Sequence, residues 1–507
     1  MLLIHPPVAK PCEAPPGIAY LAGAMRQHGH SVTLLDANLE GLLDLLAAPL
    51  EGADTWSRQA LHNRAAHLNA LRSPALFRNL DRYKRAVSDL GRVLDLAGGK
   101  YGTSLTFANF EDPHHGPQSS ADLLRAAQHP EQNPFYPWFS RRLTALLEQL
   151  RPPLIGFSLN FLSQAVTTFA MIGFLRQRFP GLPLVLGGGL LTSWMRQPEW
   201  RDPFRALVDH LIPGPGEMPL LALLGEQAGE PHSLPDFGPL KDNPYLAPGF
   251  VLPFAASRGC WWNRCSFCPE RAEGNPYSSF LPQQIRSDLD RLILETQPAL
   301  LHLLDSAVHP AVLQMLAERP DPTPWYGFVR LTEHLADGYF CRELRRSGCI
   351  MLKLGIESGD QGVLDRMEKG IDLAMASRAL AALKEAGIAT YIYLLFGTPA
   401  ESLPEARKTL AFARSHADAI TFLNLAIFNL PALEAASGPL ETRPFYAGDL
   451  SLYRDFIHPK GWNRSQVRSF LEREFKRDAA ILPILHRNPP VFTSNHAPFL
   501  QQGCHFC

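Results

Sequence analysis

Six short apolar segments, separated by stretches with helical periodicity, dominate the middle and later part of this 507-residue chain. Apolar runs of strand length that alternate with helices are typical of a curved, mostly parallel α/β sheet. The six strand candidates are LPFAASRG (252–259), ALLHLLDS (299–306), TPWYGFVR (323–330), CIMLKLGIESG (349–359), GIATYIYLLFGTP (387–399) and AITFLNLAIF (419–428). We therefore predict one parallel α/β domain over residues 251–431.

The first part of the chain carries a second α/β pattern. Strand candidates at 2–5 and 31–38 flank a helix at 15–30, and the pattern resumes with strands at 152–160, 179–189 and 208–217. This alternation predicts a doubly wound, Rossmann-like sheet within residues 1–230. Residues 43–148 are mostly helical in pattern, and we expect them to form an insertion or cap.

Two segments lack this alternation. Residues 231–250 are rich in Pro and Gly and have little periodicity, so we expect a linker there. Residues 432–507 form a mixed C-terminal extension with one clear helix at 465–486, and the chain ends in a Cys-x-x-Cys pair.

The charge balance argues against two classes of partner. There are 48 Lys and Arg against 49 Asp and Glu, a formal net charge of −1, so no field of one sign is available to collect nucleic acid or anionic lipid. No apolar run is long enough to span a bilayer, and the start MLLIHPP lacks the features of a signal peptide. We expect a cytoplasmic protein with neither a nucleic-acid nor a membrane partner.

Cysteine is sparse and clustered. Of eight cysteines, three lie together in GCWWNRCSFC (259–268) and two lie at the very end, while Cys12, Cys341 and Cys349 are isolated. A disulfide framework would spread them evenly in a smaller secreted chain, so we expect reduced cysteines. The isolated three are expected to be buried, inert thiols.

The cysteine-rich loop follows the first strand of the second domain, at the carboxyl end where α/β folds place their sites. Cys260, Cys265 and Cys268 could hold an iron-sulfur cluster with one open iron, or zinc with a remote fourth ligand. The alternative is a structural coincidence.

The loop, DS at 305–306, the segment 348–370 and the segment 382–402 together resemble the radical S-adenosylmethionine (SAM) superfamily. The first part, with GGG at 187–189 and PGPGE at 213–217, is similar to the cobalamin-binding-type domain that precedes many members. The resemblance implies a Rossmann-like cobalamin-binding-type domain followed by a partial parallel (β/α)6 radical SAM barrel.

The resemblance also implies cofactors. Cys260, Cys265 and Cys268 would bind a 4Fe-4S cluster, and SAM would chelate the fourth iron. An external one-electron reductant of flavodoxin or ferredoxin type would serve the cluster. Phe267, just before the last cysteine, would lie against the adenine or shield the cluster.

The segment GIESG (355–359) would bind SAM. Glu357 could accept hydrogen bonds from the amino group or the ribose hydroxyls, and such charge-assisted bonds are the stronger class. Gly355 and Gly359 would let the backbone approach the ligand, and Ser358 would assist. Arg330 could pair with the SAM carboxylate. A buried structural Glu and a surface Arg are the alternatives.

Two departures from the family pattern matter. The gap between Cys260 and Cys265 has one residue more than is usual, which predicts a bulged loop and a different SAM orientation. The Asp-x-His-x-x-Gly motif that supplies an axial His to cobalamin is absent, and His5 does not stand in it. Cobalamin would lack that ligand, or the domain would persist only as a scaffold.

The terminal pair Cys504 and Cys507 could hold a soft ion, form a redox disulfide or be a plain tail. We expect it to act in catalysis, and it could bind trivalent arsenic, as arsenite prefers thiolates. The predicted function is transfer of an aminocarboxypropyl or methyl group from SAM to a small molecule. Alternatives are a cobalamin-dependent C-methyltransferase, a hydrogen-abstracting natural-product enzyme and a non-catalytic metal-binding module.

Overall fold

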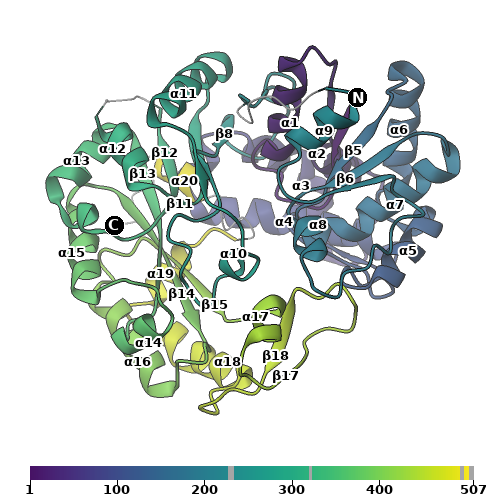
Figure 1. Ribbon diagram of the computed structural model, residues 1–507. Coiled ribbons are helices and arrows are strands. Elements are labelled where there is room, and N and C mark those ends of the chain that lie inside the picture. Colours follow the sequence, from purple (N-terminus) through teal and green to yellow (C-terminus); the bar gives the residue numbers. More distant parts are fainter. Residues whose placement is uncertain (227–232, 319–322, 491–495, 502–507) are drawn as a thin grey trace. The chain divides into compact units, whose positions relative to one another are not determined.

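The computed structural model describes residues 1–226, 233–318, 323–490 and 496–501 (Figure 1). The chain forms two compact units, and each is described by itself. Unit 1 contains Met1–Leu76, Asp81–Phe250 and Tyr446–Leu452, and unit 2 contains Phe77–Leu80, Val251–Phe445 and Tyr453–Cys507. Within the described ranges, no helix combines the length and the apolar character needed to cross a membrane.

The sheet of unit 1 has five parallel strands in the order β2-β1-β5-β6-β7. Its strands are β1 (Leu2–His5), β2 (Thr33–Asp36), β5 (Ile155–Ser158), β6 (Leu184–Gly187) and β7 (His210–Ile212). The chain winds outward in both directions from β1, so the strand order reverses between β1 and β5. In open α/β sheets, ligands bind outside the carboxyl ends of the strands at this kind of reversal.

Helices surround this sheet, and a helical segment separates β2 from β5. The helix α7 is apolar nearly all round, and 12 of its 17 residues are buried, as expected for a helix inside a fold. The helices of unit 1 are α1 (Pro16–Gln27), α2 (Ala37–Ala47), α3 (Thr55–Leu71), α4 (Leu80–Gly99), α5 (Ser120–Gln128), α6 (Tyr136–Leu150), α7 (Leu162–Arg178), α8 (Gly189–Met195) and α9 (Glu217–Leu223).

The described part of the Pro- and Gly-rich segment, residues 233–250, belongs to unit 1. Leu246 donates its N–H to the Pro11 carbonyl at 2.8 Å. Tyr245 is buried and donates its hydroxyl to Asp36 Oδ2 at 3.0 Å. Residues 233–250 thus pack along the first βαβ segment and carry no helix or strand of their own.

Unit 2 is built on six parallel strands in the order β15-β14-β13-β12-β11-β8. The strands are β8 (Val251–Phe254), β11 (Leu300–Val308), β12 (Trp325–Val329), β13 (Cys349–Glu357), β14 (Ala389–Phe396) and β15 (Phe422–Ile427). Each of the six predicted segments therefore contains one strand. All nine residues of β13 are buried, which explains why its sequence is almost continuously apolar.

Helices return the chain between successive strands of unit 2, and several lie along one side of its sheet (Figure 1). Asp side chains open three of them, because Asp337, Asp360 and Asp372 each accept a hydrogen bond from a backbone N–H of the first turn. The main helices are α11 (Pro282–Thr296), α12 (Pro310–Ala317), α13 (Gly338–Arg346), α14 (Gln361–Arg366), α15 (Leu373–Glu385) and α16 (Leu403–Ser415). The prediction of parallel α/β sheets is confirmed.

The C-terminal part of unit 2 departs from one prediction. The helix expected at 465–486 is interrupted: α18 (Arg464–Arg473) ends, a 3-10 turn follows, and α19 (Leu482–Arg487) begins anew. The side chain of Asp478 accepts the N–H of Ala480, and Pro483 has no N–H to continue an upstream helix. A small antiparallel sheet of β16 (Leu430–Pro431), β18 (Tyr453–Phe456) and β17 (Thr442–Pro444) precedes them.

Candidate functional site

The cysteine loop leaves the sheet of unit 2 directly after β8. It is closed at its base by the short antiparallel strands β9 (Ser257–Arg258) and β10 (Ser278–Ser279). Gly259 has a φ of +74°, and a Cβ there would lie 2.6 Å from the Pro276 carbonyl oxygen. A glycine is therefore required where the loop begins.

The first and second strands of the sheet are tied together beneath the loop. Asp305, on β11, is 3% exposed and accepts the Ala256 N–H at 3.1 Å and the Ser257 hydroxyl at 2.5 Å. Burial raises the pKa of Asp305, and these two donors oppose the rise. The DS pair of the sequence thus holds the start of the loop against the neighbouring strand.

The extra residue between Cys260 and Cys265 is accommodated by a left-handed turn. Asn263 has a φ of +44°, a conformation that Asn tolerates better than most residues. Trp262, just before it, donates from Nε1 to the Glu368 carbonyl at 3.1 Å. The bulge therefore carries a tryptophan into contact with the turn that follows α14.

The thiols lie close to one another and to two cations. Burial raises the pKa of Cys265 and Cys268, and neighbouring thiols add to the rise. The charges of Lys369 and Arg330 act in the other direction and lower the pKa of Cys265. Backbone N–H groups at the start of the short helix after Cys268 likewise lower the pKa of Cys268. Cations and N–H donors favour thiolates, which are the form that binds soft metals.

The three cysteines of the loop suit a metal site by their chemistry and by their closeness to one another. Within the described ranges, no group of three His, Cys, Asp or Glu side chains is already arranged to hold a metal ion. Cys260, Cys265 and Cys268 are all partly exposed and form no disulfide.

Glu357 lies at the end of β13 and forms a buried ion pair. Its Oε1 accepts from Lys369 Nζ at 2.8 Å, and the two side chains are 11% and 10% exposed. Glu357 has a φ of +69°, which is unusual for a residue with a side chain and is typical of strained functional positions. Gly355 makes room for this pair, since a Cβ there would lie 2.4 Å from Glu357 Oε1 and 3.0 Å from Lys369 Nζ.

Arg330, at the end of β12, is 8% exposed. Its guanidinium donates to the Lys369 carbonyl and, at 2.8 Å, to the Gly370 carbonyl. The Cζ atom lies 3.7 Å from the centre of the Trp262 ring. Arg330 is thus a buried contact of the cysteine loop, and its predicted pairing with a SAM carboxylate stays a prediction.

The other predicted SAM-binding residues have mixed surroundings. Phe267 is partly exposed, and Lys369 Nζ lies 5.4 Å from the centre of its ring. Ser358 is fully buried, and its hydroxyl contacts Thr409 of α16 at 3.3 Å. Gly359 donates its N–H to Thr409 at 2.9 Å, and a Cβ there would clash with α16. Ser358 and Gly359 therefore pack the end of β13 against a helix.

The side of the sheet that carries Glu357 also carries polar and aromatic residues. On the neighbouring strands, Tyr393 contacts both Phe328 and Tyr391, with ring centres 5.1 Å and 4.8 Å apart. Tyr391 in turn contacts His496, which begins the last described segment, at 4.3 Å. Cys504 and Cys507, predicted to act in catalysis, lie outside the described residues.

A buried lysine and histidine lie on strands β13 and β11. Lys353 Nζ is 3.0 Å from His302 Nε2, and the imidazole stacks on Tyr326 at 4.3 Å. Lys353 stands two residues before Gly355 on a strand, so its side chain projects to the same side as Gly355 and Glu357. These polar groups were not recognised from the sequence.

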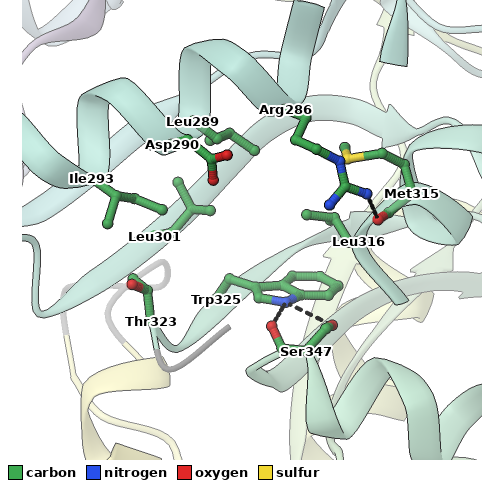
Figure 2. Close-up of a pocket in the computed structure, with 10 residues that line it drawn as sticks. All are labelled: Arg286, Leu289, Asp290, Ile293, Leu301, Met315, Leu316, Thr323, Trp325 and Ser347. Carbon is green, nitrogen blue, oxygen red and sulfur yellow. Dashed lines mark hydrogen bonds between the residues drawn. The ribbon is translucent and has the colours of Figure 1, made fainter. Parts of the chain in front are cut away.

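A separate small pocket lies at the opposite end of this sheet (Figure 2). It is lined by Leu301 and Trp325, at the amino-terminal ends of their strands, and by Ser347, which follows α13; Trp325 Nε1 donates to the Ser347 carbonyl at 2.9 Å. Its volume of about 30 Å³ holds one or two water molecules. It is too small to bind a substrate.

Unit 1 has a glycine-rich edge at the carboxyl ends of β5, β6 and β7. Asn160 accepts the Gly189 N–H at 3.0 Å. Gly188 has a φ of +109°, and a Cβ there would lie 2.3 Å from the Leu159 carbonyl oxygen. Phe161, which follows β5 and precedes α7, is 55% exposed, so this edge presents an apolar ring.

His5 and Asp36 end strands β1 and β2 and are paired in register. Burial lowers the pKa of His5 to about 4. Burial also raises the pKa of Asp36 to about 6, although the Leu39 N–H and the Tyr245 hydroxyl oppose the rise. Both side chains are less than 9% exposed, so they close this part of the edge.

The whole chain is similar in fold to one solved enzyme. It matches the radical S-adenosylmethionine methyltransferase TsrM from Kitasatospora setae, with cobalamin and a 4Fe-4S cluster bound, at a TM-score of 0.53 and 15% identity over 89% of this chain and 84% of that one. Against TsrM with tryptophan substrate and a SAM analogue bound, the TM-score is 0.57 at 15% identity, over 99% of this chain and 94% of that one.

One curated relative is similar over part of its length. It is the anaerobic magnesium-protoporphyrin IX monomethyl ester cyclase of Rubrivivax gelatinosus, which is 26% identical over 164 residues, or 31% of this chain and 29% of the relative. The chain therefore matches less than a third of that protein. No protein-family profile matches the sequence. The predicted likeness in fold to radical SAM enzymes is confirmed, and the cobalamin-binding-type character of the first domain stays a prediction.

The sequence did not reveal Lys369 or Trp262 as site residues. Lys369 belongs to the turn Met367–Gly370, and Trp262 contacts this turn. The Met367 carbonyl of the same turn accepts the Ser266 N–H at 3.0 Å. The available signal was the segment EKG after α14 and the tryptophan within the lengthened cysteine spacing. Neither sequence feature predicts that Trp262 contacts this turn, because the contact depends on the fold.

Proposed function

We propose that this chain is a radical SAM enzyme that transfers an alkyl group from SAM to a small molecule. The observation that carries the proposal is the contact between the cysteine loop and the Glu357–Lys369 pair. The turn Met367–Gly370 accepts hydrogen bonds from Ser266 and Trp262 of the loop and presents Lys369 to Glu357. Soft-metal ligands thus adjoin a matched pair of opposite charges at the carboxyl ends of parallel strands.

In this proposal Cys260, Cys265 and Cys268 hold a 4Fe-4S cluster, which when reduced supplies one electron to the sulfonium of bound SAM. The methionine end of SAM carries one ammonium and one carboxylate. Glu357 accepts from the ammonium, and Lys369 donates to the carboxylate, so the zwitterion replaces the existing ion pair without leaving either charge unpaired. Phe267 covers the loop beside Lys369.

The glycine-rich edge of unit 1 is proposed as the cobalamin site. The run of three glycines at the end of β6, Gly187 to Gly189, and the exposed Phe161 support this assignment, because a large flat ligand needs an edge with few side chains. The fold likeness to TsrM, whose structure contains cobalamin, also supports it. His5 is buried and does not replace the missing axial ligand motif. A scaffold without cofactor is the alternative.

We favour methyl transfer over aminocarboxypropyl transfer, since a solved structure that is similar over nearly the whole chain is that of a methyltransferase. The substrate is proposed to bind on the side of the sheet that carries Glu357, Tyr393 and the Lys353–His302 pair. Arsenite remains a prediction that depends on Cys504 and Cys507. Replacing both by Ser and finding unchanged arsenite binding would exclude it.

The experiment is anaerobic cluster reconstitution followed by reduction with a one-electron donor in the presence of SAM. The nucleoside product identifies the reaction: S-adenosylhomocysteine indicates methyl transfer, methylthioadenosine indicates aminocarboxypropyl transfer, and deoxyadenosine indicates hydrogen abstraction. The Cys265→Ser variant is the control and is expected to yield none of them. If the wild-type protein yields no nucleoside although it holds the cluster, a non-catalytic metal-binding module is the better description.

A further inference from the structure

Trp262 joins three parts of unit 2 that are distant in sequence. Its ring lies 3.7 Å from Arg330 Cζ, its Nε1 binds the Glu368 carbonyl, and it stands between Cys260 and Cys265. Gly370 has a φ of +61°, and a Cβ there would lie 2.3 Å from Trp262 Cζ2. The turn Met367–Gly370 is therefore shaped to receive this ring.

Arg330 is held rigidly by these contacts. Two of its hydrogen bonds go to the backbone carbonyls of Lys369 and Gly370, and one face of the planar guanidinium lies on the indole. Trp is the strongest aromatic partner for a cation, and a buried contact of this kind is stronger than an exposed one. Trp262 stands three residues before Cys265, so this contact places the guanidinium beside the cysteine loop.

We propose that the lengthened cysteine spacing places Trp262 as a platform that holds Arg330 against the cysteine loop, and that Arg330 thereby raises the reduction potential of the cluster. This inference rests on the proposed function, because it requires a cluster on Cys265. It assigns to Arg330 the role of a positioning and tuning residue.

The physical reason is electrostatic. Reduction adds negative charge to the cluster, and nearby positive charge stabilises the reduced state. Because Arg330 is 8% exposed, solvent screens its charge little.

The test is the potential of the reconstituted cluster, measured without SAM by a redox titration followed by electron paramagnetic resonance. In Arg330→Met, the ratio of reduced to oxidised cluster at a fixed potential should fall about tenfold, a shift of about 59 mV to more negative potential for one electron. Measuring without SAM separates this role from any contact of Arg330 with the SAM carboxylate.

Arg264 offers a matched control. Its guanidinium lies 5.0 Å from the centre of the same Trp262 ring, but the residue is exposed. The Arg264→Met variant removes the same charge and should leave the potential at the wild-type value. An equal shift in both arginine variants would show a general charge effect and overturn the proposal.

The role of Trp262 is tested by a double-mutant cycle. The Trp262→Leu variant keeps an apolar cover but removes the aromatic face, and it should shift the potential in the same direction as Arg330→Met. In the Arg330→Met background the same change should add nothing, because the platform then has no cation to hold. An undiminished effect of Trp262→Leu in that background would contradict the proposal.

If the Arg330→Met protein fails to bind iron, the Arg330→Lys variant is measured in its place. Lysine keeps the positive charge but loses the planar stacking on the indole and the forked hydrogen bonds. The variant should then show a more negative potential than wild type, and a wild-type value would overturn the proposal. Wild-type protein that binds no four-iron cluster would instead refute the proposed function itself.

Discussion

Lys369 Nζ lies 2.8 Å from Glu357 Oε1, and both side chains are about nine-tenths buried at the end of β13. Removing one partner leaves a buried charge unpaired, which typically costs about 3–5 kcal/mol. We expect Glu357→Gln and Lys369→Met each to lower the free energy of unfolding of the cluster-free protein. Urea denaturation followed by circular dichroism measures this change.

The double variant Glu357→Gln, Lys369→Met is expected to be more stable than either single variant, because neither charge remains. The same double variant should bind SAM at least tenfold more weakly than the wild-type protein in isothermal titration calorimetry on reconstituted samples. If the double variant regains stability and also binds SAM with wild-type affinity, the pair has only a structural role.

The strands of both sheets could be predicted because their signal is local. β13 is nine buried residues, and its sequence is almost continuously apolar. The break between α18 and α19 was not predicted, since the apolar periodicity continues across it. Two local features prevent one continuous helix: the Asp478 side chain accepts the Ala480 N–H, and Pro483 has no N–H to donate. A periodicity argument averages such details away.

The candidate site could be predicted in part. Cys260, Cys265 and Glu357 were identified through short motifs, whereas Lys369 and Trp262 were not. The bond from Trp262 to Glu368 joins residues 106 positions apart, so their meeting follows from the fold alone. Arg330 was identified, but its contacts with the Gly370 carbonyl and the Trp262 ring could not be read from the sequence.

Single Cys→Ser variants at Cys260, Cys265 and Cys268 are expected to lose most of the iron bound on reconstitution, because each removes one of three thiolate ligands. Iron and sulfide analysis with visible absorbance measures the loss. Cys341→Ala is the matched control: this thiol is fully buried and contacts the Leu335 carbonyl, so iron content should stay at the wild-type level. Normal iron in Cys265→Ser would disprove the ligand assignment.

Gly188→Ala tests the glycine-rich edge of unit 1. The positive φ and the 2.3 Å approach to the Leu159 carbonyl leave no room for a methyl group, and strain of this kind costs about 1–3 kcal/mol. We expect lower stability and at least tenfold weaker binding of hydroxocobalamin, followed by visible absorbance. Gly91→Ala is the control: this residue lies within α4, where a Cβ would meet nothing within 4 Å, so the variant should be folded and should bind normally. Equal binding by both variants would place cobalamin elsewhere.

Glu401 makes the stability of unit 2 depend on pH. It is fully buried, and burial raises its pKa from 4.5 to about 7, although the Gly397 N–H and the Trp462 indole N–H oppose the rise. The folded state therefore holds this proton more tightly than the unfolded state. Its contribution to stability is complete below pH 4.5 and is lost as the pH rises to about 7.

Glu401→Gln keeps an oxygen for the two donors but has no charge, so it should be about 2–3 kcal/mol more stable than wild type at pH 8 and nearly equal to it at pH 4.5. Urea unfolding at both pH values measures the difference. Glu405→Gln is the control of opposite sign: the Ser402 hydroxyl lowers the pKa of Glu405, so this substitution should remove stability that is present above pH 4.5. A Glu401→Gln protein less stable than wild type at pH 8 would show that the ionised carboxylate is favoured in the folded state.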